Sequence, residues 1–126
     1  MEKEFVSYEI ALALKELKFD EECLAYYKGG LTNELIIEDT FGNITGRYKY
    51  RVTAPLYQQA FKFFREKYNI DSAVIKDDIS QYFGEIRKNT YPVSYHSYTT
   101  ITNAFESYAE TEKELLNKLI ELCTKN

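Results

Sequence analysis

The chain has 126 residues, a length typical of one domain. Its formal net charge of −4 at pH 7 argues against a general affinity for nucleic acids or anionic membranes. No apolar run approaches the roughly 20 residues of a membrane span. The start, Met-Glu-Lys-Glu-Phe, lacks the basic and apolar regions of a signal peptide. We therefore expect a cytoplasmic protein without a membrane partner.

The numbers of tyrosine and cysteine residues further limit the kinds of protein that this chain could be. The chain holds 12 Tyr and 8 Phe but no Trp. This many tyrosines suits half-buried sheet faces or a binding surface. Cys23 and Cys123 lie far apart and have no metal-ligand spacing, which predicts two reduced thiols.

The first predicted element is a short helix. Ser7 can cap it, and it ends near Leu17 or Lys18. Ile10, Leu14 and Leu17 recur at helical spacing and predict one apolar stripe. A helix this short is marginal alone, so we expect it to pack on another element.

Three strands are predicted next, over residues 23–28, 34–40 and 44–52. The third alternates most clearly between small or apolar residues and polar residues, as a half-buried strand does. Gly42 and Asn43 suit a two-residue type II′ turn that would join the second and third strands as a hairpin.

This turn would fix the register of the hairpin. Glu34 would lie opposite Arg51 and Glu38 opposite Arg47, while the other face would bring together large apolar residues. Cross-strand pairs of both kinds favour a hairpin by roughly 0.2–1 kcal/mol each, and a one-residue slip would destroy them.

A central helix is predicted from Thr53 to Ile70, with Thr53 or Ala54 as its cap and Pro55 in its first turn. Asn69 is a natural stop. The predicted apolar stripe consists of Leu56, Ala60, Phe63, Phe64 and Tyr68.

The second half repeats the order of strands and a helix. Strands are predicted over residues 71–76, 79–88 and 91–102. Asp77 and Asp78 would form the first turn. Ser107 and Glu110 have the spacing of a capping box, which opens a last helix that runs to about Cys123.

A second two-residue loop is predicted at residues 89–90. It would place Ile86 opposite Val93 and Gly84 opposite Tyr95. The whole chain then forms a single α+β domain over residues 1–126. Its order is helix, three strands, helix, three strands, helix, and its antiparallel sheet, whole or split in two, has the helices packed on one face.

A basic row is the first candidate site. Arg47, Lys49 and Arg51 fall on one face of a predicted strand. Such a row could grip a phosphate or a nucleotide. The predicted partners Glu34 and Glu38 favour instead an ordinary solvated face with surface ion pairs.

Enzyme chemistry has few candidate residues. His96 is the only histidine, so a multi-histidine metal site is excluded, although nearby Tyr95 leaves a His-Tyr proton-transfer site conceivable. Cys23 is the better candidate of the two thiols. The chain has no Gly-rich phosphate loop, Gly-x-Ser-x-Gly or His-Glu-x-x-His motif. We expect no metal, no cofactor and no catalytic residue, and the balance favours a non-enzymatic protein.

Tyrosines on the predicted strands offer a surface for protein binding. Tyr27, Tyr82 and Tyr98 are the candidates whose faces the pattern leaves undetermined. Exposed together, they would form an adhesive surface. Turned toward the helices, they would be ordinary core residues.

Three segments show a resemblance to known proteins. They are Tyr-Glu-Ile-Ala-Leu-Ala-Leu-Lys-Glu-Leu from Tyr8 with its continuation to Tyr27, Ala-Pro-Leu-Tyr-Gln-Gln-Ala-Phe-Lys-Phe-Phe-Arg-Glu-Lys-Tyr at residues 54–68, and Ser-Tyr-Ala-Glu at 107–110 with Leu-Asn-Lys-Leu-Ile-Glu-Leu at 116–122. Together they resemble small uncharacterised proteins encoded by phages, prophages and mobile elements of Bacteroides-group gut bacteria. The resemblance implies no activity and no catalytic residues. It implies a phage-encoded accessory protein in the bacterial cytoplasm.

The leading hypothesis is a protein that binds a host or phage protein without catalysis. Inhibition of a host defence system is one way in which it could serve a phage, and a homodimer through a sheet edge is a further expectation. The alternative hypothesis is a protein that sequesters a small ligand or nucleotide. Its candidate ligand-binding residues are Arg47, Lys49, Arg51, Tyr95 and His96.

Overall fold

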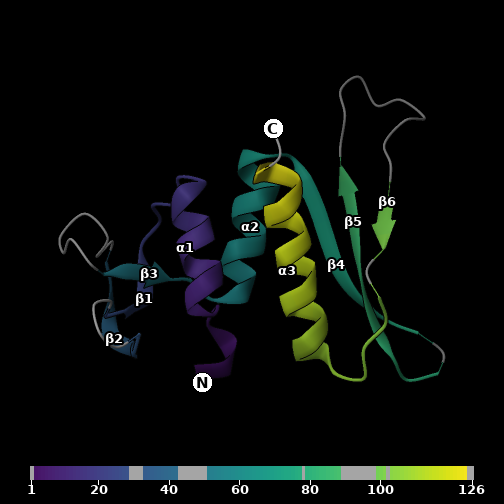
Figure 1. Ribbon diagram of the computed structural model, residues 1–126, viewed down its shortest axis with the longest axis horizontal. Helices are drawn as coiled ribbons and strands as arrows, with labels where there is room; N and C mark the ends of the chain where they lie inside the picture. Colours follow the sequence, from purple (N-terminus) through teal and green to yellow (C-terminus); the bar gives the residue numbers. More distant parts are fainter. Residues whose placement is uncertain are drawn as a thin grey trace. The chain divides into compact units, whose positions relative to one another are not determined.

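The computed structural model describes residues 2–28, 33–42, 51–77, 79–88, 99–101 and 103–124. Within them the protein is an α+β structure with antiparallel sheets (Figure 1). In chain order the elements are the 3₁₀ turn η1 (Glu2–Glu4), α1 (Tyr8–Glu16), β1 (Cys23–Tyr27), β2 (Leu35–Gly42), β3 (Val52–Ala54), α2 (Tyr57–Lys67), β4 (Ile70–Lys76), β5 (Tyr82–Lys88), β6 (Thr99–Ile101) and α3 (Tyr108–Thr124).

The chain divides into two compact units, Met1–Gln59 and Ala60–Asn126, with the boundary inside α2. The α+β class and the antiparallel pairing are confirmed. The predicted order agrees with the described elements only in part. The strands expected over 44–52 and 91–102 are described only as the short β3 and β6, and β3 lies mostly past the first of these ranges. The remainder of the predicted order stays a prediction.

The first helix agrees with its prediction. The Ser7 hydroxyl accepts a hydrogen bond from the Ile10 amide at 3.4 Å, as a helix cap does. The helix ends at Leu17, and Lys18 then has a φ of 72°. Ile10 and Leu14 are buried, as the stripe predicts.

The first sheet has the order β2-β1-β3, and both pairings are antiparallel. The predicted hairpin between the second and third strands is therefore wrong in the described residues, because β1 lies between them. Glu34 accepts a hydrogen bond from the Lys28 amide at 3.0 Å, beside β1 and not opposite Arg51. Gly42 belongs to β2, opposite Cys23, and does not form a turn. Arg47 and Lys49 lie outside the described residues.

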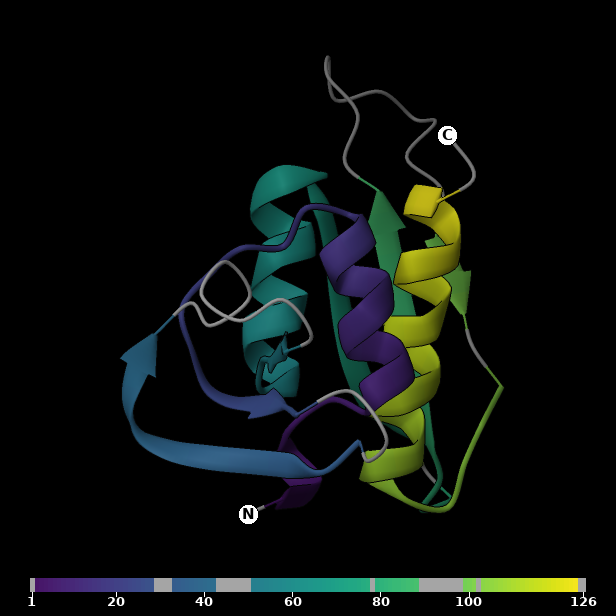
Figure 2. The same ribbon diagram turned by 60° about the vertical axis from the view of Figure 1, so that its left-hand side comes forward.

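The composition of β1 explains its central place. Four of its five side chains are buried, and a central strand needs apolar residues on both faces. Its pairing with β2 shifts register between Cys23 and Ala25, and Figure 2 shows β2 as a long, bent strand.

The central helix begins later than predicted. Thr53 and Ala54 are not caps but buried residues of β3, paired with Tyr26 and Ala25. The burial of three consecutive residues favours a strand there over a helix start. The helix is confirmed from Tyr57 to Lys67, but Ile70, the predicted last residue, begins β4. Of the predicted stripe, Ala60, Phe63 and Phe64 are buried together with Phe61, whereas Leu56 and Tyr68 are only half-buried.

The stop of the helix at Asn69 agrees with its prediction. Asn69 has a φ of 56°, the left-handed conformation that Asn tolerates better than most residues and that often follows a helix.

The second sheet has the order β4-β5-β6. β4 and β5 pair without a break from Ile70 opposite Lys88 to Lys76 opposite Tyr82. The predicted pairing of β5 with the next strand is wrong, because Ile86 lies opposite Thr100 and not Val93. The local turn signal at residues 89–90 thus did not set this register. Tyr95, the predicted partner of Gly84, lies outside the described residues.

The turn between β4 and β5 is longer than predicted. One carboxylate oxygen of Asp77 accepts hydrogen bonds from the amides of Ile79 and Gln81, both at 2.9 Å. Its own amide donates to the Gln81 carbonyl at 2.8 Å. Asp77 therefore has the predicted turn role, but β5 begins at Tyr82 and Ile79 is not in a strand.

Helix α3 packs on β4 and β5. The Ser107 hydroxyl accepts from the Glu110 amide at 3.2 Å and donates to the Glu110 carboxylate at 3.0 Å. The capping pair is thus confirmed, although the carboxylate accepts from the hydroxyl and not from the Ser107 amide. The helix buries one side, which consists of Thr111, Leu115, Leu116, Leu119 and Cys123.

Candidate binding surfaces of the second unit

Ring contacts link Tyr82 of β5 to Tyr108 of α3 and to Lys76 at the end of β4, and Ile79 lies three residues before Tyr82 in the chain, between β4 and β5. We call them the aromatic end: Lys76, Ile79, Tyr82 and Tyr108. The rings of Tyr82 and Tyr108 meet edge to face with centroids 5.9 Å apart. The Lys76 ammonium lies 5.8 Å from the Tyr82 centroid, within range of a cation–π contact.

The aromatic end exposes apolar surface. Ile79 is 75% exposed and Tyr108 is 45% exposed. Apart from Ile37 in β2, no other large apolar side chain of the described residues is as exposed. Exposed apolar and aromatic groups with polar neighbours are typical of protein-binding sites.

Hydrogen bonds hold the aromatic end in place. Tyr82 and Phe105 exchange both backbone hydrogen bonds at 2.7 Å. The hydroxyl of Thr111, which is completely buried, donates to the Ser107 carbonyl at 3.0 Å and lies 3.3 Å from the Tyr82 carbonyl. These bonds join α3 to β5, so the two rings are positioned before any partner binds, which lowers the entropy cost of binding.

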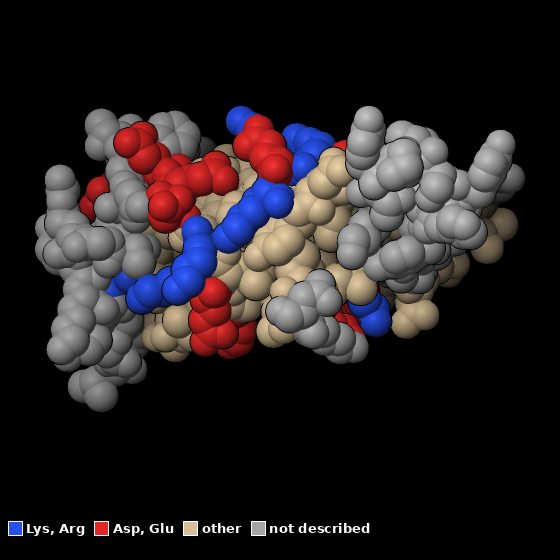
Figure 3. All heavy atoms as spheres, turned by 90° about the horizontal axis from the view of Figure 1, so that it is seen from above, with Lys and Arg blue, Asp and Glu red and all other residues tan. Residues whose placement is uncertain are grey.

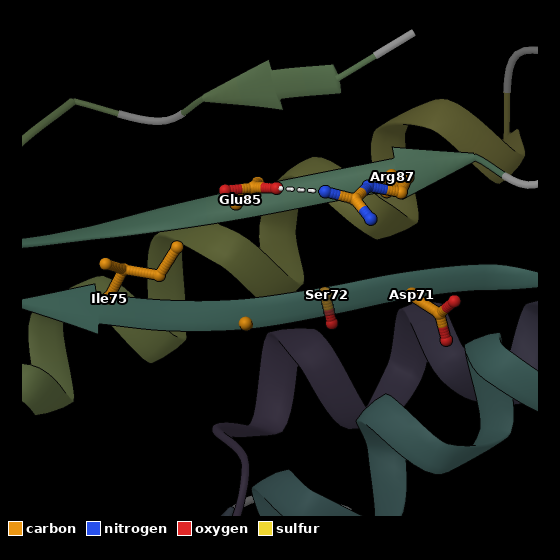
Figure 4. Close-up of a pocket in the computed structure, with 6 residues that line it drawn as sticks. Asp71, Ser72, Ile75, Glu85 and Arg87 are labelled. Atoms are coloured by element: carbon orange, nitrogen blue, oxygen red, sulfur yellow. Dashed lines mark hydrogen bonds and ion pairs between the residues drawn. The ribbon is translucent and has the colours of Figure 1, made fainter. Parts of the chain in front are cut away.

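A shallow hollow of about 220 Å³ lies along β4 and β5. We call it the outer hollow, and Figure 4 shows how its residues lie. It is lined by Asp71, Ser72, Ala73, Ile75, Glu85 and Arg87.

Strand register explains the make-up of the outer hollow. Ala73 lies opposite Glu85, and Asp71 lies opposite Arg87, so these four residues share one sheet face. The small side chain of Ala73 leaves the depression. The Arg87 guanidinium is 3.2 Å from a Glu85 carboxylate oxygen (Figure 4).

The charges of the outer hollow do not suit a phosphate. Two carboxylates, those of Asp71 and Glu85, face one guanidinium, that of Arg87. A phosphate site needs a surplus of donors. The hollow is also smaller than the roughly 300–1,000 Å³ of ordinary ligand pockets.

The predicted basic row is described only at Arg51. Its guanidinium carbon lies 4.6 Å from the centroid of the Tyr26 ring, where it makes a cation–π contact. The other predicted ligand-binding residues, Arg47, Lys49, Tyr95 and His96, lie outside the described residues.

The predicted protein-binding tyrosines have different environments. Tyr27 is 9% exposed, and its hydroxyl donates to the Val6 carbonyl at 2.6 Å. Its ring packs edge to face on Tyr8 with centroids 5.5 Å apart, so little of it is left for a partner. Tyr82 belongs to the aromatic end. Tyr98 lies outside the described residues.

Cys23 is a poor nucleophile. Burial raises the pKa of its thiol to about 12, although hydrogen bonds with the side chains of Thr53 and Gln59 lower it in part. The thiol donates to the Glu21 carbonyl at 3.4 Å. A thiol with this pKa stays protonated near neutral pH, and the thiolate is the reactive form.

Charges of both signs mix on the surface. In Figure 3, Lys and Arg side chains border Asp and Glu side chains on the face shown. Two ion pairs of this kind, Lys62–Glu66 and Lys118–Glu121, have separations of 3.9 Å and exposed partners. Exposed pairs contribute little to stability, from about 0 to 1 kcal/mol.

The described residues contain neither a metal-binding cluster nor a membrane-spanning helix. No group of three or more His, Cys, Asp or Glu side chains in the described ranges could hold a metal ion. Within the same ranges, no helix has the length and apolarity to cross a membrane.

Neither a protein-family model, nor a curated protein, nor a solved structure matches this chain.

The sequence contained signals for the residues that were missed. Tyr108 directly follows the cap Ser107, and the buried side of α3 begins only at Thr111. The hollow could have been sought from the period-two pattern of Asp71, Ala73 and Ile75, which alternates with the residues facing α3.

Proposed function

We propose that the protein is non-enzymatic and acts by binding another protein through the aromatic end. The observation that carries this proposal is the exposure of Ile79 and Tyr108 beside Tyr82, on hydrogen-bonded backbone. Tyrosine gives a large contact area with few rotatable bonds, and exposed aromatic residues are frequent among those that dominate binding energy.

The setting of the proposal comes from the sequence resemblance. The protein would be a phage-encoded accessory protein in the cytoplasm of a bacterial host, and its partner would be a host or phage protein. Inhibition of a host defence system is one role that such binding would serve. A homodimer through a sheet edge belongs to the same proposal.

The structure offers little support for the alternative of ligand sequestration. Arg51 is in contact with Tyr26, and the outer hollow has more carboxylates than guanidinium groups. The raised pKa of Cys23 likewise argues against nucleophilic catalysis by that thiol.

An affinity experiment with matched variants tests the proposal. The wild-type protein, the double variant Ile79→Ser with Tyr108→Ser, and the control Ile37→Ser would each be immobilised and incubated with bacterial host lysate. The control removes the other exposed large apolar residue of the described chain, Ile37 in β2. Quantitative mass spectrometry would identify the retained proteins.

We expect a protein that the wild type and the control retain equally and that the double variant loses by about tenfold or more, since truncating a residue that dominates an interface costs about 2 kcal/mol or more. Equal retention by all three proteins would show that the aromatic end is not the binding surface. If the immobilised wild-type protein retains no lysate protein above the background of bare beads, the result would count against protein binding in this lysate.

A further inference from the structure

One edge of the second sheet is long and regular. β4 spans seven residues and pairs with β5 over its whole length without a bulge. Within the described residues β4 ends the sheet order, with β5 as its strand neighbour on one side (Figure 4). The other described edges are shorter or less regular, since β3 and β6 span three residues each and the pairing of β2 shifts register. Among these edges, β4 is therefore the best suited to accept another strand.

The backbone of β4 offers hydrogen-bonding groups to such a strand. The amides and carbonyls of a strand point alternately to its two sides, so about half of those in β4 point away from β5. From Ser72 to Lys76, the described part of the chain contains no backbone hydrogen bond outside the pairing with β5. The usual blocks are also missing, because β4 has no proline or glycine and its two charged residues, Asp71 and Lys76, lie near its ends.

Symmetry limits the ways in which two copies of β4 can pair. Two identical edges can join antiparallel about a two-fold axis perpendicular to the sheet. Such an axis keeps every side chain on its own face, so it allows only the registers in which one residue lies opposite itself. The residues near the middle of the strand that could take this position are Ser72, Ala73 and Val74.

Length and charge favour Ala73 at the axis. With Ala73 opposite itself, Ile70 lies opposite Lys76 of the second copy, so all seven residues of β4 are paired. In the same register Asp71 lies opposite Ile75 of the second copy. No like charges then lie directly opposite each other along β4.

The two alternative registers fit less well. With Val74 at the axis, Asp71 would lie opposite Asp77 of the second copy, and like charges directly opposite each other are destabilising. With Ser72 at the axis, the last two residues of β4 would extend beyond the β4 strand of the second copy.

Side-chain size suits the same register. Ala73 is exposed, and its small side chain leaves the depression of the outer hollow. With Ala73 at the axis, Ile75 of one copy is the diagonal neighbour of Ala73 of the other copy on the outer face. Diagonal neighbours lie about 7–8 Å apart, within reach of long side chains. Each Ile75 side chain can therefore cover the depression beside the Ala73 of the other copy.

We infer that β4 pairs antiparallel with β4 of a second copy of this chain, with Ala73 at the two-fold axis. The homodimer then has one continuous sheet of order β6-β5-β4-β4-β5-β6. This inference rests on the proposed function, of which a homodimer through a sheet edge is a part, and it names the edge and the register. A second copy is the occupant because the edge fits itself in length, charge and side-chain size.

A charge exchange at the axis tests the register. Ala73→Lys and Ala73→Asp each place like charges opposite each other, so each variant should dimerise about tenfold or more weakly than the wild type. An equimolar mixture of the two variants brings Lys opposite Asp and should recover association to within about threefold of the wild type. Sedimentation velocity from micromolar to millimolar protein would measure all four samples.

An oxidation experiment tests the same register by distance. Residues directly opposite in an antiparallel pair have Cα atoms about 4.5–5.5 Å apart, within the range of a disulfide. Mild oxidation should therefore link the variant Ala73→Cys into a covalent dimer. In the control Ile75→Cys the two thiols would lie about 13 Å or more apart, too far for a disulfide. The native Cys23 and Cys123 are buried and should not compete.

Dilution of the ¹⁵N-labelled wild type gives a test without any variant. We expect the amide chemical shifts of β4 to change between micromolar and millimolar protein. A wild type that stays monomeric, or that dimerises without β4 shifts, overturns the inference. Equal covalent dimers from both cysteine variants, or a mixture of folded charge variants that stays monomeric, overturns the register. If a charge variant fails to fold, the wild-type shifts and the oxidation experiment decide.

The lysate experiment remains separate from these tests. A monomeric wild type would leave any retention of a lysate protein through the aromatic end unchanged. Conversely, equal retention by all the lysate variants would leave the dimer through β4 unchanged, so failure of the inference and failure of protein binding at the aromatic end are distinguishable.

Discussion

Burial decides what single side chains of this protein can do, and Cys23 is the clearest case. Its thiol is fully shielded from solvent in β1, and its nearest polar contacts are the Glu21 carbonyl and the side chains of Thr53 and Gln59. From sequence alone it was the better of two candidate nucleophiles. Exposure depends on residues distant in the chain, which a local motif does not contain.

The pKa of Cys23 predicts a pH dependence of stability. The folded pKa is about 12 and the ordinary value is 9.0, so above pH 9 the unfolded chain releases a proton that the folded chain keeps. The free energy of unfolding should therefore be unaffected by this group below pH 9 and should fall between pH 9 and 12, by at most about 1.4 kcal/mol per pH unit.

Urea unfolding of the wild type and of Cys23→Ala across pH 8 to about 11 would measure this effect. The variant retains the Lys and Tyr titrations, so the difference in slope isolates the thiol. Parallel slopes for the two proteins would show that Cys23 ionises equally in the folded and unfolded states.

The helix ends are the elements that sequence predicted best. Ser7, Asn69 and Ser107 all have the predicted cap or stop geometry, because each acts on backbone groups within a few residues of itself. Elements whose position depends on distant partners were predicted less well. The start of α2 is the example, since Thr53 is held in β3 by pairing with Tyr26.

The wrongly predicted hairpin shows that the pairing of strands also depends on residues distant in the chain. Residues 34–52 favoured pairing with one another through a plausible turn and complementary charges. The observed sheet places β1 between β2 and β3, because the apolar side chains of β1 are buried on both faces. The unbroken apolar run Cys-Leu-Ala-Tyr-Tyr was a signal for a central strand that could have been weighted more heavily.

The hydrogen bonds between Ser107 and Glu110 at the start of α3 predict how substitutions of Ser107 change the stability of the protein. Ser107→Ala removes the hydroxyl that accepts from the Glu110 amide and donates to its carboxylate, so it should lower the free energy of unfolding by about 1 kcal/mol. Ser107→Asp keeps an acceptor at the same position and adds a favourable charge at the helix start. It should retain most of the stability.

Chemical denaturation of both variants would measure these changes. Because α3 and β5 are joined through Thr111, the loss should also appear as faster amide exchange at Tyr82. An Asp variant as unstable as the Ala variant would contradict the capping role of Ser107.

At the scale of the molecule, the chain divides into two units between Gln59 and Ala60. The two units can therefore unfold either together in one cooperative transition or separately. Each unit has about 60 residues, a size at which a separate core is marginal. The two units share α2, a continuous helix of 11 residues that contains the boundary. From the length of the chain we predict that the molecule unfolds as a single domain.

The variant Leu14→Ala tests this cooperativity. Leu14 in α1 is completely buried in the first unit, and truncating a buried leucine costs about 2–5 kcal/mol. If the molecule unfolds as one, amide exchange of the most protected residues should accelerate by the same factor in β1 and in β5. The matched variant Leu119→Ala, at an equally buried position of α3, should have the reciprocal effect on β1. If each variant instead accelerates exchange only in its own unit, the two units are independent folding domains, and the aromatic end could then be studied on the second unit alone.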